Sequence, residues 1–217
     1  MILITGGDGS LAQALRECFE SVGYEIAAPG RSSLDVSDRR SVGAFFRTLS
    51  EPVELVINQA GSLRDGPLLK MNEADWDKVL DAHLKGTWLV SQAYAASLQG
   101  RPGHLIQVGS YSGLVGPAGQ CNYAAAKAGL IGLTQSLARE WGAQSIRSNI
   151  VLPGFLETAM TASLTDVQRA KFREDHVLGS FNTVHHVAEF VRFLHEDLPH
   201  VSGQTFQLDS RVRRPGW

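Results

Sequence analysis

The chain has 217 residues, which is enough to bury one good-sized core and favours a single α/β domain over residues 1–217. Its 20 basic and 22 acidic residues leave a formal charge of −2 without a run of like charges, which argues against nucleic acid and anionic membranes as partners. Its two cysteines suit neither a disulfide framework nor a metal site, so we expect a cytoplasmic protein. No apolar run approaches the roughly 20 residues of a membrane span, and we expect no leader peptide.

The N-terminal segment reads as a strand, a glycine turn and a helix. Residues 1–5 are apolar, the turn is TGGDGSLA, and residues 10–19 carry apolar side chains at helical spacing. In the dinucleotide-binding arrangement, backbone N–H groups at the start of such a helix receive a pyrophosphate. We therefore expect cofactor contacts at Gly6, Asp8, Gly9, Ser10 and Leu11.

The second predicted strand, residues 24–28, is followed by the sequence PGRSSLDVSD. Dinucleotide folds that bind NAD usually carry an acidic side chain there, whereas an arginine suits the extra phosphate of NADP. Arg31 is therefore predicted to clamp that phosphate, with Ser32 and Ser33 as helpers. A plain loop cation is the alternative.

The next segments continue the alternation of strands and helices. Residues 37–49 are predicted to form a helix capped by Ser37 or Asp38, and residues 53–57 to form a strand that ends in NQAG. The glycine of NQAG allows close approach of a ligand, and Asn58 can bond neighbouring loops, although a simple turn at the strand end fits equally well. A helical pattern then covers a long stretch, residues 73–98, and leaves apolar surface for a partner.

A serine, a tyrosine and a lysine are combined in the stretch VGSYSGLVGPAGQCNYAAAK. The predicted strand 104–108 leads to Ser110, and Tyr123 and Lys127 lie four positions apart on a helix that is predicted to begin near Cys121. A cation within about 4 to 6 Å lowers the pKa of a phenol, so Tyr123 could act as a general acid or base toward a carbonyl or an alcohol. Ser110 would donate a second hydrogen bond to the same oxygen. Alternatively, the tyrosine and lysine simply decorate a solvated helix face.

The remaining segments complete the alternating pattern. The helix after Tyr123 continues with an inward apolar stripe, residues 146–152 form a strand that ends in PGFLET, and residues 184–194 and 204–208 form a last helix and strand. Residues 161–175 are mixed and polar, as in a mobile lid or an ordinary surface helix. We therefore expect a Rossmann-type, doubly wound parallel α/β sheet.

Together these motifs resemble the short-chain dehydrogenase/reductase family over essentially the whole chain. TGGDG, NQAG, the serine 13 positions before the tyrosine of YAAAK, and PGFLET occur in the order of that family. Within it, GQCNYAAAKAGLIGLTQSLARE and PGFLETAMTASLTDVQRA look most like the beta-ketoacyl-acyl carrier protein reductases. The resemblance implies reduction of a 3-oxoacyl thioester to the 3-hydroxyacyl form by hydride transfer from NADPH.

The resemblance also implies roles for individual residues. Tyr123 would be the general acid, Lys127 would lower its pKa and bond the nicotinamide ribose, and Ser110 would hold the substrate carbonyl. Arg101 falls where such reductases place a basic residue for the acidic helix of the carrier protein. The other cofactor contacts would come from Asp35 and Val36 at the adenine, from Asn58, Ala60 and Gly61 along the cofactor, and from Pro153, Gly154, Leu156 and Thr158 at the nicotinamide.

The chain departs from the family at several positions. Its glycine turn has Ser10 and Ala12 in place of further glycines. Gly9 replaces the arginine that selects NADP, so the preference for NADP(H) rests on Arg31. The interval between residues 28 and 53 has room for one helix only, and consecutive parallel strands need a crossover of about a dozen residues or more. We therefore predict that the third strand is shortened or missing, a feature that is similar to the dTDP-4-dehydrorhamnose reductase branch.

The family usually has asparagine at the position of His83, in the sequence WDKVLDAHLKGTW. That asparagine helps to hold a water that links the lysine to solvent for reprotonation. His83 could bond such a water, and it could equally be a core histidine on an apolar helix face. We keep it as a candidate relay residue.

Three functions remain open at this point. The leading hypothesis is an NADPH-dependent ketoreductase that acts on a 3-oxoacyl chain presented by an acyl carrier protein. Reduction of a sugar or another small carbonyl fits the shortened second-strand region, and a catalytically silent NADP-binding partner subunit fits the altered turn and His83. The resemblance further implies a homo-oligomer, a dimer or tetramer, formed through the helices 73–98 and 122–141.

Overall fold

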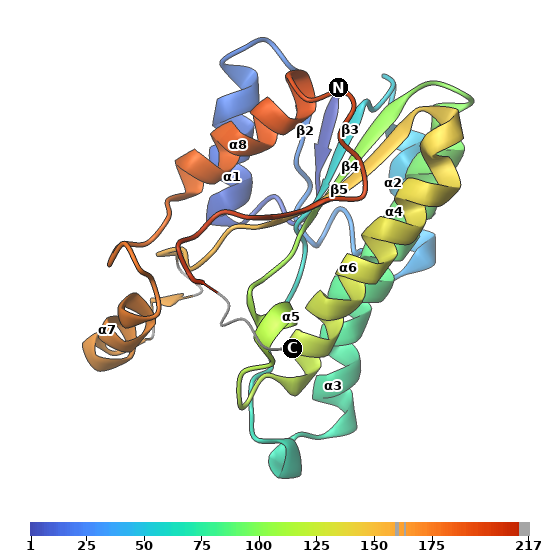
Figure 1. Ribbon diagram of the computed structural model, residues 1–217. Helices are drawn as coiled ribbons and strands as arrows, with labels where there is room; N and C mark the ends of the chain where they lie inside the picture. Colours follow the sequence, from blue (N-terminus) through green and yellow to red (C-terminus); the bar gives the residue numbers. More distant parts are fainter. Residues whose placement is uncertain (159–160, 163, 213–217) are drawn as a thin grey trace.

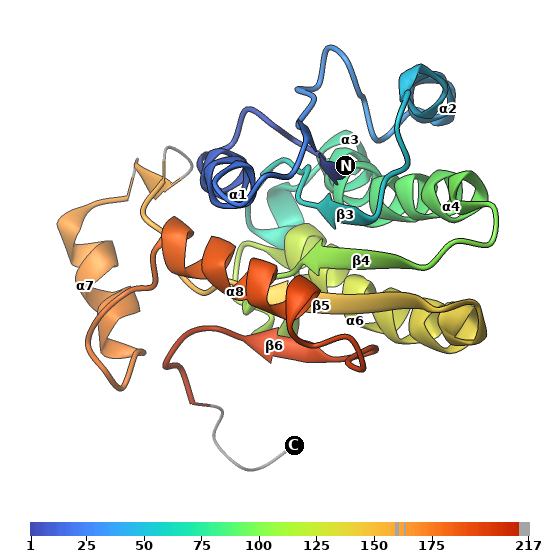
Figure 2. The same cartoon turned by 90° about the horizontal axis from the view of Figure 1, so that it is seen from above.

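The computed structural model describes residues 1–158, 161–162 and 164–212. Its strands form one parallel sheet in the order β2-β1-β3-β4-β5-β6 (Figures 1 and 2). They are β1 (Ile2–Ile4), β2 (Ile26–Ala27), β3 (Leu55–Asn58), β4 (Gly103–Val108), β5 (Ile146–Leu152) and β6 (Thr205–Gln207). None of the helices in these residues has the length and apolarity needed to cross a membrane.

Helices cover both faces of the sheet. They are α1 (Ser10–Glu20), α2 (Arg39–Thr48), α3 (Glu73–Leu80), α4 (Gly86–Leu98), α5 (Ser112–Val115), α6 (Cys121–Trp141), α7 (Asp166–Glu174) and α8 (Val184–Glu196), with the short turns η1 (Leu68–Lys70), η2 (Asp81–Lys85) and η3 (Gly142–Gln144). In Figure 1, α1 and α8 lie on one side of the strands and α2, α4 and α6 on the other. Ile2 and Ile4 pack into the core under α1 and α8, whereas Leu3 packs into the core under α2 and α4. This burial on both faces explains the apolar strands and confirms the predicted doubly wound fold.

The predicted loss of the third strand is confirmed. β2 is an edge strand that pairs with β1, and residues 28–38 run from it directly to α2. The N–H groups of Ser33 and Leu34 donate to the carbonyl oxygen of Gly30, which closes a turn in this segment. Asp38 then caps α2 by accepting from the N–H of Arg40. Because the segment holds only this turn and the cap, α2 carries the chain from the edge strand past β1 to β3.

The helical pattern predicted over residues 73–98 is divided into three parts. α3 and α4 are joined by η2, a π-helical segment that contains His83. The side chain of Asn72 caps α3 by accepting from the N–H of Asp75. A π-helical turn is rare and is found frequently at functional sites. The turn leaves His83 only 5% exposed, on the side of the helix that meets the rest of the molecule.

A buried histidine and a half-buried one form a pair at the end of the sheet where β4 begins. His104 of β4 stacks on His195 of α8, with ring centres 5.5 Å apart. The two Nδ1 atoms are 3.3 Å apart, and Nδ2 of Asn149 lies 3.1 Å from Nε2 of His104. Burial, with a smaller effect from the charge of Arg147, holds the pKa of both histidines below the ordinary value. Both rings are therefore neutral at neutral pH.

Acid is expected to destabilise the fold through this pair. A histidine in the unfolded chain titrates near pH 6.5, whereas the folded His104 ring stays neutral, so its contribution to stability is complete above that pH and is lost as the pH falls below it. Between pH 7.5 and pH 5.5, His104 should remove about 1.4 kcal/mol from the free energy of unfolding. Urea unfolding at the two pH values measures the difference. His104→Gln should reduce this pH dependence and the exposed His185→Gln should not, and equal slopes in the two variants would contradict the prediction.

Candidate active site

The candidate site is a cleft of about 890 Å³ at the carboxyl ends of β1, β3, β4 and β5. The order of the strands reverses beside β1, and doubly wound folds bind ligands outside the carboxyl ends of the strands at such a point. Most residues predicted for the site line this cleft, and Asn58 and the two helper serines, Ser32 and Ser33, do not. The predicted residues that line it are Gly6, Asp8, Gly9, Ser10, Leu11, Arg31, Asp35, Val36, Ala60, Gly61, His83, Ser110, Tyr123, Lys127, Pro153, Gly154, Leu156 and Thr158.

The glycines of the turn between β1 and α1 let other parts of the chain come close to its backbone. Gly6 has a φ of +74°, and a Cβ on it would lie 2.9 Å from Cα of Ala60. Gly7 was not predicted as a site residue, yet a Cβ on it would lie 2.0 Å from the carbonyl oxygen of Ala28; its signal in the sequence is the second glycine of TGGDG. Gly9 precedes α1 and leaves the first N–H groups of that helix without a side-chain cap. Such N–H groups at the positive end of a helix dipole suit a pyrophosphate.

Asn58 lies outside the lining of the cleft, and its contact with the cofactor stays a prediction. Its side chain is buried, and Nδ2 donates to Oε1 of Gln107 over 2.9 Å. Asn58 therefore joins β3 to β4 beneath the cleft. The loop after β3 is held by Thr5 instead, whose hydroxyl oxygen accepts from the N–H groups of Gln59 and Ala60 at 3.0 and 3.1 Å.

Arg31 and Asp35 were predicted to meet different parts of a cofactor and are joined in one ion pair. Nε and Nη2 of Arg31 donate to Oδ2 of Asp35 over 3.1 and 3.0 Å. The pKa of Asp35 lies below its ordinary value, chiefly because the hydroxyl of Ser37 donates to its carboxylate. The side chain of Arg31 is 69% exposed, so the pair is weak and the guanidinium can turn toward a phosphate.

Ser110, Tyr123 and Lys127 meet where β4 ends. Ser110 follows this strand, and α6 carries the tyrosine and the lysine one helical turn apart. Nζ of Lys127 donates to the carbonyl oxygen of Val108 over 2.6 Å and lies 5.6 Å from the centre of the Tyr123 ring. Ser110 also acts on Tyr123, because its side chain lowers the pKa of the phenol. The three groups thus share one wall of the cleft, and their catalytic roles stay predictions.

Burial has the largest effect on the pKa values of Tyr123 and Lys127 at this wall of the cleft. It raises the pKa of Tyr123 above the ordinary value, while the hydrogen bond from Ser110 lowers that pKa and the charge of Asp65 raises it. Burial also lowers the pKa of Lys127 to about 7. The net shift of Tyr123 is therefore opposite to the one expected from Lys127, because removing the phenolate from water outweighs the favourable contacts.

His83 lies beside the tyrosine. Its ring packs edge-on against Tyr123, with 5.1 Å between the ring centres. Nε2 of His83 lies 3.1 Å from the nitrogen and 2.9 Å from the oxygen of Ser62, and the buried Nδ1 has no hydrogen-bond partner in the described part of the chain. Burial and the charge of Lys127 lower the pKa of His83 to about 3. His83 can therefore pass on a hydrogen bond but is not a cation at neutral pH, and its relay role stays a prediction.

Gly61 is expected to reject a side chain because of this histidine. A Cβ on Gly61 would lie 1.9 Å from Cε1 of His83. Gly61→Ala should therefore lower the free energy of unfolding by about 1 to 3 kcal/mol, the usual cost of overpacking. Combining it with His83→Ala removes the clash, so the double variant should lose less stability than the sum of the two single losses.

Urea unfolding of the single and double variants checks this coupling. Gly66→Ala in the same loop is a matched control, because a Cβ on Gly66 meets nothing within 4 Å. It should change the free energy of unfolding by no more than about 0.5 kcal/mol. Additive losses at positions 61 and 83 would show that His83 does not occupy the space above Gly61.

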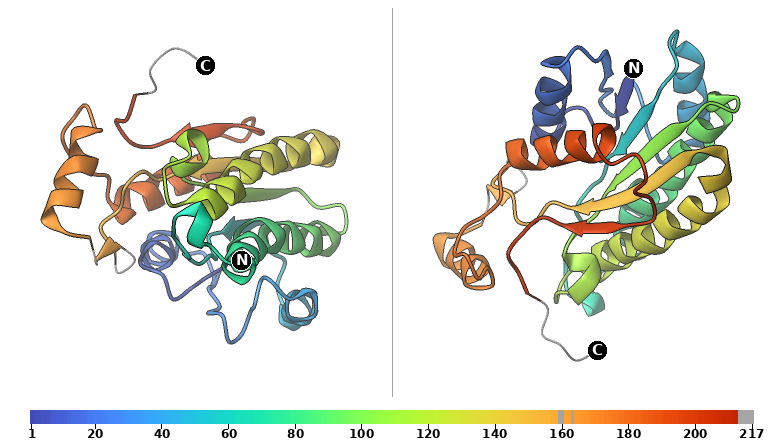
Figure 3. Two further views of the ribbon diagram at one scale, coloured as in Figure 1. Left: turned by 90° about the horizontal axis from the view of Figure 1, so that it is seen from below. Right: turned by 45° about the horizontal axis from the view of Figure 1, so that its top comes forward.

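The described residues 155–158, 161–162 and 164–183 are here called the flap, and Phe155 and Thr161 among them line the cleft. Helix α7 projects from them away from the sheet (Figures 1 and 3). For residues 161–175, the observed element is a surface helix, one of the two structures predicted there. Phe155 stacks on Phe172 of this helix and packs against Phe181, with ring centres 5.1 and 4.3 Å apart. These aromatic contacts attach the flap to the turn after β5.

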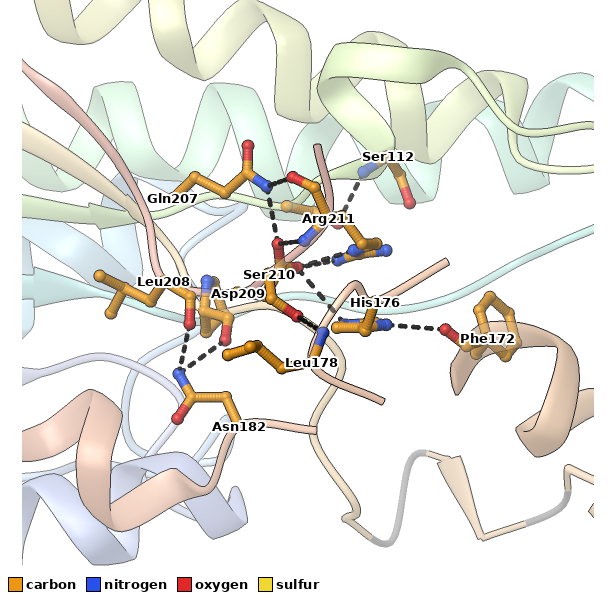
Figure 4. Close-up of polar contacts among 12 residues, drawn as sticks. Ser112, Phe172, His176, Leu178, Asn182, Gln207, Leu208, Asp209, Ser210 and Arg211 are labelled. Atoms are coloured by element: carbon orange, nitrogen blue, oxygen red, sulfur yellow. Dashed lines mark hydrogen bonds and ion pairs between the residues drawn. The ribbon is translucent and has the colours of Figure 1, made fainter. Parts of the chain in front are cut away.

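The chain that follows β6 returns across the base of the flap (Figure 4). The buried carboxylate of Asp209 accepts from Nε of Arg211 and from Nε2 of Gln207, each over 2.7 Å. Its Oδ2 also lies 3.8 Å from Nε2 of the buried His176, just after α7. A Cβ on Gly154 would lie 2.7 Å from Cβ of Asp209, so the turn after β5 packs against the same residue. Sequence reasoning missed this cluster because its members come from separate segments without a shared motif.

Arg101 lies away from the cleft. It precedes β4, whose other end reaches the cleft, and so lies toward the opposite end of the sheet. Its Nε donates to the carbonyl oxygen of Leu98 over 3.0 Å, and its Nη2 donates to that of Ser97 over 3.2 Å. Arg101 therefore caps the end of α4, and its role in docking a carrier protein stays a prediction.

Comparisons with known proteins agree with this arrangement. The family model described as Enoyl-(Acyl carrier protein) reductase matches residues 2–210. The chain is 41% identical over 212 residues to a (3R)-3-hydroxyacyl-CoA dehydrogenase of Mus musculus, which covers 93% of this chain and 82% of that protein. It is 34% identical over 213 residues to the 3-oxoacyl-[acyl-carrier-protein] reductase FabG of Aquifex aeolicus, which covers 96% of this chain and 85% of the relative.

A solved structure shares the fold closely. It is described as a 2-deoxy-D-gluconate 3-dehydrogenase from Agrobacterium tumefaciens with bound NADP. The TM-score is 0.90 at 26% sequence identity, and the match covers 96% of this chain and 94% of the other. The backbone that carries the cleft is therefore one that also occurs in a dehydrogenase with a dinucleotide.

Proposed function

The chain belongs to the short-chain dehydrogenase/reductase family of oxidoreductases, and we propose that it reduces 3-oxoacyl thioesters with NADPH. The observation that carries this proposal is the meeting of Ser110, Tyr123 and Lys127 in one cleft with the open N-terminus of α1. The names of the mouse and Aquifex relatives support an acyl substrate. The NADP in the Agrobacterium structure supports the cofactor.

The residues that line the cleft support a dinucleotide as its ligand. The first N–H groups of α1 would hold the pyrophosphate, Arg31 the extra phosphate of NADP, and the turn at Gly154 the nicotinamide. Gly6 leaves the space that a side chain would fill. NADPH in this position would supply the hydride that adds to the carbonyl carbon.

The side chains would complete the reduction with a proton. As the hydride adds to the carbonyl carbon, the phenol of Tyr123 gives its proton to the carbonyl oxygen, and the product is an alcohol. The raised pKa of Tyr123 keeps that proton in place at neutral pH, which suits a general acid in the direction of reduction. Ser110 donates to the same oxygen as negative charge develops on it. Lys127, with a pKa of about 7, can then return a proton toward the tyrosinate.

The test compares cofactors and substrates in one assay. NADPH oxidation with acetoacetyl-CoA and with an acetoacetyl carrier-protein thioester is expected to be fast, and oxidation with a ketosugar to be slow. The rate with NADH should be lower than the rate with NADPH. Arg31→Ala should bring the two rates closer together, because it weakens the binding of NADPH. The carrier-protein thioester should be preferred if the carrier is part of the natural substrate.

Two results would overturn the proposal. Faster turnover of a ketosugar than of the thioesters would favour a sugar reductase, which the name of the Agrobacterium structure also supports. Binding of NADPH without turnover of any carbonyl would favour a silent partner subunit. The full set of Ser110, Tyr123 and Lys127 in the cleft argues against that second result.

The same family membership supports a homo-oligomer. We place its interface on the helical runs of α3 and α4 and of α6, as the resemblance to the family implied. Trp88 of α4 is 40% exposed, which leaves aromatic area on this face for a second copy of the chain. The interface and the number of copies are part of the proposal.

A further inference from the structure

The carboxylate of Asp8 lies where a side chain of residue 30 would begin. Asp8 belongs to the turn between β1 and α1, and Gly30 follows the edge strand β2. A Cβ on Gly30 would lie 2.8 Å from Oδ1 and 2.9 Å from Cγ of Asp8, and Oδ2 would be closer still. The carboxylate therefore covers the bare Cα of Gly30 and fills the space that the glycine leaves free.

Backbone bonds keep the two segments together. The N–H of Gly7, just before Asp8, donates to the carbonyl oxygen of Pro29 over 2.9 Å. Asp8 itself is exposed and lines the cleft. Arg31, the residue after Gly30, donates to Asp35 instead of to Asp8. The place of the Asp8 carboxylate is thus set by the backbone on both sides of it, and its oxygens face the cleft.

The end of the second strand is where dinucleotide folds recognise the adenosine ribose. An acidic side chain there accepts hydrogen bonds from the ribose hydroxyls of NAD, whereas an arginine suits the extra phosphate of NADP. The first residues after β2 are Ala28, Pro29 and Gly30, and they carry no such group. Asp8 brings a carboxylate to this place from the end of the neighbouring strand β1, and Arg31 brings a cation.

These two charges act on the cofactor in opposite directions. A carboxylate only accepts hydrogen bonds, so Asp8 can bind the ribose hydroxyls of NADH, whereas it repels the 2′-phosphate of NADPH. The guanidinium of Arg31 attracts that phosphate, although Asp35 competes for it. The preference for NADPH over NADH is therefore the difference between the effects of Arg31 and Asp8.

We propose that Asp8 is a specificity-determining residue, which accepts hydrogen bonds from the adenosine ribose and so narrows the preference for NADPH that Arg31 supplies. The acidic group that other dinucleotide folds carry on the second strand would here come from the glycine turn. This inference rests on the proposed function for the identity of the cofactor and is independent of the carbonyl substrate. Variants of Asp8 and Arg31 should shift the preference in opposite directions.

Binding of the two cofactors tests this inference without turnover. NADPH and NADH differ only in the 2′-phosphate, so the ratio of their Kd values, measured by cofactor fluorescence, reports on this place alone. Asp8→Asn should raise the preference for NADPH about 10-fold, the effect of one charged contact, and Arg31→Ala should lower it. Glu17→Gln is the matched control, because it removes an exposed carboxylate of α1 that does not line the cleft. It should leave the ratio unchanged.

A variant of Gly30 tests the position of the carboxylate. Gly30→Ala places a methyl group where the carboxylate lies, and the exposed side chain of Asp8 can turn away from it. The variant should therefore raise the preference for NADPH in the parent protein and leave it unchanged in Asp8→Ala. An equal effect of the methyl group in both proteins would show that Asp8 does not act from this position.

Steady-state kinetics with acetoacetyl-CoA should show the same change in the ratio of kcat/KM for the two cofactors. A ratio of Kd values in Asp8→Asn that equals those of the parent and of Glu17→Gln would overturn the inference. If the parent binds both cofactors and reduces no carbonyl, the proposed function fails, while the ratio of Kd values still decides the role of Asp8.

Discussion

Replacing Tyr123 with phenylalanine is expected to lower kcat for ketone reduction by about 10²- to 10⁴-fold. The phenolic proton balances the addition of hydride, and burial keeps that proton on Tyr123 at neutral pH. Phenylalanine retains the ring that packs against His83 and lies beside Lys127, so the affinity for NADPH and the stability should change little. Steady-state kinetics with acetoacetyl-CoA, together with NADPH binding by fluorescence, measure the three quantities separately.

Tyr111→Phe is a suitable control for this variant. Tyr111 is the residue after Ser110, and the guanidinium of Arg211 stacks 3.9 Å from the centre of its ring. The substitution removes a tyrosine hydroxyl close to the site without touching the three candidate catalytic groups, so kcat should be retained. Equal kcat for Tyr123→Phe and the parent protein would rule out the proposed general acid.

The second large effect is expected on stability, from Asp209→Asn. The carboxylate is buried, with 1% of the side chain exposed, and it pairs with Arg211 and lies beside His176. Removing one partner of a buried ion pair leaves the other charge uncompensated and costs on the order of 3 kcal/mol. We therefore expect a loss of about that size in the free energy of unfolding by urea. Amide hydrogen exchange at Val177, which donates to the carbonyl oxygen of Ser210, should become faster.

Glu196→Gln gives the matched control, since it also changes a carboxylate to an amide. Glu196 pairs with Arg192 on α8 over 2.7 Å, and the two side chains are 25% and 34% exposed. A pair that reaches solvent in this way contributes less than about 1 kcal/mol. A similar loss in both variants, or unchanged exchange at Val177 in Asp209→Asn, would show that Asp209 does not hold the flap.

Local patterns in the sequence were enough to predict most of the fold. Apolar runs and helical spacing placed every strand and most helices close to their observed bounds, because strands that are buried on both faces must be apolar along their length. The loss of the third strand could be predicted from the length of one segment. Residues 28–38 are too few to hold both a crossover helix and a further strand. The break in the helix at residues 81–85 had no such signal, because a π-helical turn changes the backbone without a distinct composition.

The residues of the site were predicted in part. Tyr123 and Lys127 could be placed together because a helix fixes the relation of positions four apart. The bond of Asn58 could not be predicted, because its partner, Gln107, lies on a neighbouring strand that is far away in the chain. The shift in the pKa of Tyr123 was expected in the wrong direction, because the degree of burial depends on everything that packs around the ring.

The sequence by itself thus determined the alternation of strands and helices, the lost strand, the glycine turn, and the spacing of the serine, tyrosine and lysine, which all depend on local periodicity or on length. The tertiary structure alone decided that Gln120 bonds Asp65 of a distant loop, and that Asp209 joins the flap to the segment after β6. These contacts join segments that a linear pattern cannot pair. The same packing set the proton affinities of Tyr123 and Lys127, since desolvation is a property of the assembled cleft.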